Sequence, residues 1–128
     1  MATNWNDVVK HLTKHYKCEQ ATADLVRMVF SFETRSQLVL VARGTGGQGD
    51  WIHIQSPIGE PPVNKLTPLL EECGSKLCGA LVMMSGCVFL RHSIPVTSFK
   101  PDEFDWALKA VMATADNMEE RFVGGDKY

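Results

Sequence analysis

The sequence predicts an α+β protein with a single five-stranded antiparallel sheet, with helices covering one of its faces. One observation is a hairpin pattern in which the apolar runs Leu81–Met84 and Cys87–Leu90 flank Ser85-Gly86. Two residues ending in glycine between such runs favour a tight turn, because tight hairpin turns need positive φ. The other is a long amphipathic stripe after Pro101, whose three- and four-residue steps are typical of a helix. Its members are Phe104, Leu108, Val111, Ala115, Met118 and Phe122.

The bulk composition fits a single domain spanning residues 1–128. Of these 128 residues, 45% are hydrophobic and 22% are charged, which is ordinary for a globular protein with one core. A net charge of -2 gives no drive towards nucleic acid or an anionic membrane surface. No apolar run approaches the roughly 20 residues that span a bilayer. The N-terminus has no basic segment followed by an apolar one, so we expect no signal peptide and a cytoplasmic location.

The first predicted helix covers residues 4–17, with Thr3 or Asn4 as its cap. His11 and His15 are four positions apart and could share a metal ion. However, no glutamate lies between them as in HExxH, and no third ligand is evident. We therefore interpret the pair as solvated or half-buried and expect no metal. The apolar stripe of this helix contains Trp5, Val8, Val9, Leu12 and Tyr16.

Two strands are predicted next, over 25–33 and 37–43, with the loop at 34–36. This loop would pair Phe32 with Leu38 and would direct the alternate side chains of both strands towards the core. The expected core-facing residues are Met28, Phe30, Phe32, Leu38, Leu40 and Ala42. The opposite face would then carry Arg27, Val29, Ser31, Val39, Val41 and Arg43.

The stretch Gly44–Gly49 matches GxGxxG as a string of letters. In a dinucleotide-binding fold this string leads from a strand into a helix, whose N-terminus holds the pyrophosphate. Here an apolar run that reads as a strand over 51–57 follows instead. We therefore expect a mobile hairpin loop over 44–50 that binds no nucleotide, and no cofactor at all. His53, alone on this strand, is interpreted as structural.

The middle of the chain predicts a short helix and gives no metal-binding pattern. Leu66, Leu69, Leu70 and Cys73 have helical spacing, and Gly74 is a natural stop. The cysteines form no CxxC pair and no Cys/His spacing typical of zinc, so we expect reduced, buried thiols. They are Cys18, Cys73, Cys78 and Cys87.

The second hairpin has two unlike faces, and one of them completes a candidate surface. Leu81, Met83, Val88, Leu90 and His92 share the side that we assign to the core. The other side contains Arg91 among apolar residues, and apolar side chains on the watery face of a sheet need a covering. We expect a second copy of the chain, an extended segment of a partner protein, or both, to bury that face. The predicted partner or dimer surface contains Val29, Val39, Val41, Val82, Phe89 and Arg91.

The predicted element order α-β-β-β-α-β-β-α resembles the type III secretion chaperone-like fold, which the YbjN-like group of bacterial proteins shares. The most recognisable local piece is Gly86 to Phe104, where a strand leads through Ile94-Pro95 into the last helix. The resemblance implies a small cytoplasmic homodimer with no enzymatic activity. Secretion chaperones hold extended segments of partner proteins against apolar surfaces, so it also implies a protein-binding role.

Two other functions stay open. One is a regulatory or interaction protein that binds a folded partner. The other is an enzyme or small-ligand protein that uses His53, His92 or the pair His11 and His15. Catalysis needs a base within hydrogen-bond reach of a nucleophile or substrate proton. The spacing of these histidines does not join them, although two histidines and a carboxylate converging in a cleft would favour an enzyme.

Overall fold

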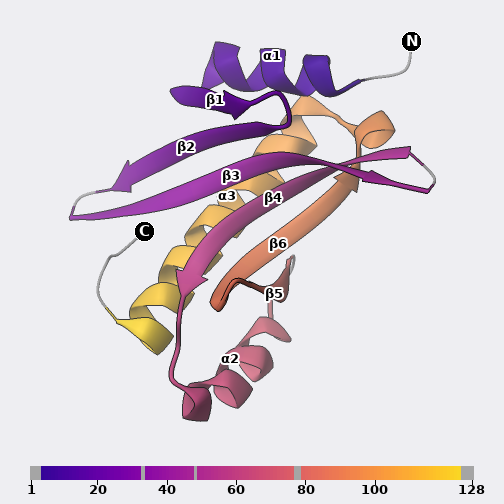
Figure 1. The fold of residues 1–128 in the computed structure, drawn as a ribbon. Helices are drawn as coiled ribbons and strands as arrows, with labels where there is room; N and C mark the ends of the chain where they lie inside the picture. The colour runs from indigo at the N-terminus through magenta and orange to yellow at the C-terminus, as the bar shows by residue number, and fades with distance from the viewer. Residues whose placement is uncertain (1–3, 33, 48, 77–78, 125–128) are drawn as a thin grey trace.

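The computed structural model describes residues 4–32, 34–47, 49–76 and 79–124, and their fold is α+β. All the strands that it describes form one antiparallel sheet, in the order β1-β2-β3-β4-β6-β5 (Figure 1). The strands are β1 (Cys18–Thr22), β2 (Leu25–Phe32), β3 (Arg35–Gly46), β4 (Gly49–Gly59), β5 (Ala80–Met84) and β6 (Cys87–Pro95). The helices are α1 (Trp5–His15), α2 (Leu66–Cys73) and α3 (Pro101–Met118).

The sheet has six strands, so the prediction of five was wrong. The additional strand is β1, which pairs with β2 at one edge of the sheet. Four of its five residues are exposed. A polar edge strand shows no alternation of apolar and polar side chains, so no periodic pattern in the sequence indicated it.

The helices α1 and α3 cover one face of the sheet and bury the predicted stripes. Figure 1 shows α3 running behind the sheet, which it contacts through β3, β4 and β6. The Asn4 side chain caps α1 by accepting a hydrogen bond from the Asp7 backbone, and the Asp7 carboxylate accepts one from the Asn4 backbone. The buried stripe residues are Trp5, Val8 and Leu12 of α1 and Phe104, Leu108, Val111, Ala115 and Met118 of α3.

The register of the first hairpin differs from the prediction by the length of its turn. Phe32 lies opposite Arg35, so only positions 33 and 34 connect β2 to β3. Val39 then lies opposite Met28 and Val41 lies opposite Val26, and all four side chains face the helices. The predicted pairing put these two β3 valines on the far side of the sheet. It was wrong because the observed pairing is displaced by three residues, and a displacement by an odd number of residues turns every side chain of a strand to the other face.

The second hairpin has the predicted register. Ser85 and Gly86 both have positive φ, at 52° and 81°, as a two-residue turn requires. Met84 lies opposite Cys87, and Val88 and Leu90 are buried on the helix side of the sheet.

The glycine-rich stretch belongs mostly to strands rather than to a loop over 44–50. The β3–β4 ladder continues as far as Gly46 opposite Gly49, so Gly44–Gly46 and Gly49–Asp50 are strand residues. Gln48 lies outside the described residues.

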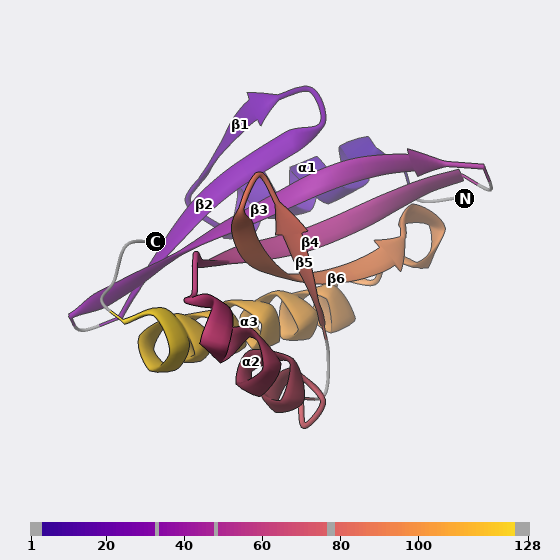
Figure 2. The same cartoon turned by 60° about the horizontal axis from the view of Figure 1, so that its bottom comes forward.

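The helix α2 lies on the same side of the sheet as α3, beside its C-terminal end (Figure 2). One π-helical turn, Glu119–Val123, follows α3, and Arg121 of this turn donates a hydrogen bond to Glu72 of α2. Among the helices of the described residues, none is both long enough and apolar enough to cross a membrane.

Candidate functional site

The candidate site is the sheet face opposite the helices, called the open face below. A row of side chains crosses it from β2 to β6, and we call this the arginine row. Arg27 lies opposite Leu40, Leu40 opposite Gln55, and Gln55 opposite Arg91. Four strands therefore contribute one residue each, and the row has an arginine at either end.

A second set of side chains lies two residues along each strand, and we call it the apolar row. Val29 lies opposite Leu38, while Phe89 lies between Pro57 on β4 and Val82 on β5. Val29 is 47% exposed. Trp51, on the same face of β4, is 37% exposed. These are large apolar side chains on a face that no helix of the described residues covers, which is unusual for a solvated sheet.

The structure brings together four of the six residues that the sequence placed on a partner or dimer surface. They are Val29, Val82, Phe89 and Arg91. Val39 and Val41 were placed there wrongly, because both are 0% exposed in the core.

The wrong register also misplaced Leu38, Leu40 and Arg43 of β3. Leu38 and Leu40, which the sequence assigned to the core, lie on the open face instead. Arg43 shares the helix side with Val41 and pairs with Asp50 at 2.8 Å. Alternation could not have separated these sets, because β3 is apolar on both sides and only the turn length fixes its register.

The arginines of the open face differ from the other three of the chain. Arg35, Arg43 and Arg121 each pair with a carboxylate. Arg27 and Arg91 have no carboxylate within ion-pair distance among the described residues.

The hydrogen bonds of Arg91 go to neutral atoms. Its Nε donates to Gln55 Oε1 at 2.9 Å, and its Nη2 donates to Met84 Sδ at 3.3 Å. The carboxylates nearest in register lie at the borders of the face. Glu19 is opposite Arg27 on β1, and Glu60 is beside the hairpin turn at Gly86.

His53 lies on the open face next to the arginine row. Its Nδ1 and Ser93 Oγ are 2.7 Å apart. Burial, and secondly the charge of Arg91, lower the pKa of His53. Its ring occupies the space above Gly44, where an added Cβ would be 2.3 Å from Nε2. The first glycine of the GxGxxG string therefore makes room for a histidine ring.

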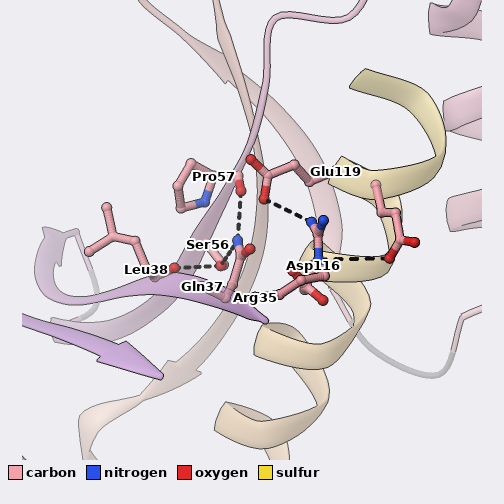
Figure 3. Close-up of polar contacts among 8 residues, drawn as sticks. Arg35, Gln37, Leu38, Ser56, Pro57, Asp116 and Glu119 are labelled. Carbon is pink, nitrogen blue, oxygen red and sulfur yellow. Dashed lines mark hydrogen bonds and ion pairs between the residues drawn. The ribbon is translucent and has the colours of Figure 1, made fainter. Parts of the chain in front are cut away.

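On the helix side of the sheet, polar side chains are paired with one another, as Figure 3 shows. Arg35 on β3 donates from Nε to Asp116 Oδ1 on α3 at 3.0 Å, and its Nη2 is 3.7 Å from the fully buried Glu119. Gln37, also fully buried, donates to Ser56 Oγ and to the Pro57 carbonyl, both at 2.8 Å. These contacts join β3 to β4 and to the end of α3, so we assign them a structural role.

The histidine pair of α1 lies in a polar contact between α1 and α3. His11 Nε2 is 2.9 Å from Asp105 Oδ1, and the rings of His11 and His15 are 4.7 Å apart. The same Asp105 oxygen accepts a hydrogen bond from the Tyr16 hydroxyl at 2.7 Å. Burial and this carboxylate raise the pKa of Tyr16 above its usual value. The Asp105 oxygen is thus already used in joining the two helices.

The described residues contain no group of three His, Cys, Asp or Glu side chains that could hold a metal ion. His92 lies on the helix side of β6, opposite Ile54, and is separate from the other histidines. Cys18, Cys73 and Cys87 are partly buried, and Cys78 lies outside the described residues.

A second apolar feature lies between α2 and the edge strand β5. It is a groove of about 210 Å³, and we call it the α2–β5 groove. Leu70 and Met83 in its lining are 61% and 58% exposed. The groove is lined by Leu66, Leu69, Leu70, Leu81, Val82, Met83 and Val88.

No protein-family model matches this chain, and no curated protein sequence matches it either.

Proposed function

We propose that this protein is a non-enzymatic protein-binding module that holds a segment of a partner protein against its open face and acts as a homodimer. The observation that carries the proposal is the uncovered apolar surface of a sheet whose other face forms the hydrophobic core with the helices. Burying apolar surface is worth about 25 cal/mol for each Å² removed from water. A partner segment that covers the two rows would therefore gain substantial free energy.

The arrangement of the sheet supports the chaperone-like character of the module. An antiparallel sheet with its helices on one face and a short helix before the last hairpin is what the resemblance to type III secretion chaperones implies. The bacterial origin and the cytoplasmic location belong to the same proposal.

The homodimer is assigned to the α2–β5 groove. Its lining carries no charge, and the exposed Leu70 and Met83 are suited to fill the same groove of a second copy. A twofold interface uses one self-complementary patch, so identical apolar surfaces can meet there without opposing charges.

A regulatory protein that binds a folded partner is the second candidate, because the same open face could dock a folded surface. An enzyme has less support. The His11 side chain is 10% exposed, and its Nε2 is already bonded to Asp105, so a substrate proton would have to displace that contact.

The binding proposal is tested with a displayed library of random short peptides. Wild-type protein should enrich peptides, and the double variant Leu40→Thr/Phe89→Thr, altered on the open face, should lose them. Threonine keeps the strand propensity, and circular dichroism checks the fold. Trp106→Thr is the matched control, because Trp106 on α3 is 76% exposed and distant in the fold from the open face. No enrichment, or equal binding by the double variant, would contradict the proposal.

The homodimer is tested separately by light scattering behind size exclusion. The wild type should have about twice the chain mass of 14.2 kDa, and Leu70→Gln/Met83→Gln should shift it towards the monomer. A monomeric wild type would remove this part of the proposal without affecting the first.

A further inference from the structure

We infer that the segment bound by the open face is acidic and apolar, with one carboxylate at Arg91 and a second at Arg27. This inference rests on the proposed function and names the chemistry of the partner. The observation behind it is the arginine row. Its two arginines, Arg27 and Arg91, are the only ones that form no ion pair with a carboxylate among the described residues.

The side chain of Arg91 has donors that could still bind a carboxylate. A guanidinium has five N–H donors and stays charged in proteins. Two of these donors are used, and both go to neutral acceptors, Gln55 Oε1 and Met84 Sδ. A segment that packs on the apolar neighbours Phe89 and Val82 would exclude water from the surroundings of Arg91. An arginine in such a place binds a carboxylate with charge-assisted, often bidentate hydrogen bonds.

The spacing of the row gives the spacing of the carboxylates. Arg27 on β2 and Arg91 on β6 are three interstrand steps apart, which corresponds to about 14 Å between their backbones. An extended segment rises about 3.4 Å per residue, so about four residues span this distance. Side chains of an extended segment alternate, so both carboxylates would point towards the sheet. The residue midway between them also points down, onto Leu40 and Gln55. The expected pattern is acid-x-apolar-x-acid.

A second copy of this chain has no carboxylate within the arginine row, since Glu19, opposite Arg27 on β1, lies at the border of the face. A twofold interface would place one arginine row against the other. Neither row contains a carboxylate, so like charges would oppose each other in an apolar setting, which is costly. The charge of the open face therefore favours a different chain as its occupant.

The test uses short labelled peptides that differ only in the two charged positions. One peptide carries two glutamates four positions apart around a leucine, and the matched peptides carry two glutamines or two lysines there. For wild-type protein, we expect the glutamate peptide to bind at least about tenfold more tightly than the lysine peptide, and this ratio to fall with added salt. In Arg91→Glu the order should reverse, so that the lysine peptide binds more tightly.

Two variants keep this result interpretable. Arg91→Gln removes the charge with less disturbance, and it should reduce the preference without reversing it. Lys109→Glu, at an exposed position of α3, changes the net charge by the same amount as Arg91→Glu. It should leave the order of the three peptides unchanged.

Several outcomes would overturn the inference. Equal affinity for the three peptides, or an order that Arg91→Glu leaves unchanged, would refute the acidic partner. If those peptides still lost binding in Leu40→Thr/Phe89→Thr, the protein-binding function would stand without the charge preference. Absence of binding by every peptide and by the displayed library would refute both. A wild-type dimer that dissociates in Leu40→Thr/Phe89→Thr would show that a second copy occupies the face.

Discussion

The two faces of the sheet are both rich in apolar side chains, but they differ in how they treat charge. On the helix side, Val39 and Val41 are fully buried, and the two arginines on that side of β3 both meet carboxylates. Arg35 meets Asp116 and Glu119, and Arg43 meets Asp50. On the open face, Leu40 remains partly exposed, and Arg91 meets only neutral groups. Charges that must stay buried in the folded chain are paired within it. The arginine charges of the open face meet no carboxylate among the described residues.

The largest expected effect comes from placing a charge on each side of β3. Val41→Asp should unfold the protein or destabilise it by more than about 4 kcal/mol, because an unpaired charge would be buried in the core. Leu40→Asp, one residue earlier, should cost about 1 kcal/mol or less, because the open face admits water. Denaturant titration followed by circular dichroism measures both. Similar losses for the two variants would mean that the faces are not distinct.

The next effect compares an arginine from each face. Arg35→Met should cost about 3 kcal/mol, because it breaks an ion pair with the fully buried Glu119. Arg91→Met should cost about 1 kcal/mol, the worth of an ordinary hydrogen bond. The same denaturation experiment gives both values.

A double variant separates the charge effect from packing. In Arg35→Met/Glu119→Gln the buried charge is gone, so the loss should be smaller than in Arg35→Met alone. A larger loss in the double variant would contradict a role for the Arg35–Glu119 pairing.

The sequence predicts well those elements whose signal is local. The stripe from Phe104 to Met118 has a single helical period, and Ser85-Gly86 marks its turn by residue type alone. Both were confirmed. The strand β1 was missed because an edge strand with exposed side chains needs no apolar pattern.

The candidate site was only half predictable for the same physical reason. Val29 and Phe89 were placed on the correct face, because Met28 and Val88 beside them are buried and the alternation is fixed by one strand at a time. Leu40 was not, because its strand is apolar on both sides and its facing depends on the turn. The arginine row itself is a property of the register between four strands, which no single stretch of sequence contains.

A smaller effect concerns Gly44, which lies under the His53 ring. Gly44→Ala should move that ring and break its contact with Ser93, at a cost of about 1 kcal/mol, since a side chain on the open face can swing away. Gly47→Ala is the control, because an added Cβ there meets nothing within 4 Å. Thermal denaturation compares them. Equal melting temperatures for the two variants would show that the ring does not need this glycine.

The smallest effect is a pKa change that reports on the charge of Arg91. Burial is the main cause of the low pKa of His53 and the Arg91 charge is the second, so Arg91→Gln should raise this pKa while leaving it below its usual value. Arg27→Gln, at the far end of the arginine row, should leave it unchanged. A titration of the His53 ring protons by NMR measures both. An equal rise of the His53 pKa in both variants would mean that the effect does not depend on the distance between the arginine and His53.

The direction of the shift also fixes how His53 affects stability. Above pH about 6.5 the imidazole is neutral in the folded and unfolded chains, so its titration changes nothing. As the pH falls below that value, the unfolded chain takes up the proton first, and the free energy of unfolding decreases. The decrease ends once the pH passes the lower pKa of the folded chain. Because Arg91→Gln raises this folded pKa, it should narrow the window and reduce the loss, whereas His53→Gln should abolish it. If His53→Gln retains the full loss of stability as the pH falls below about 6.5, a group other than His53 causes this loss. The pH dependence would then give no evidence that the charge of Arg91 acts on His53.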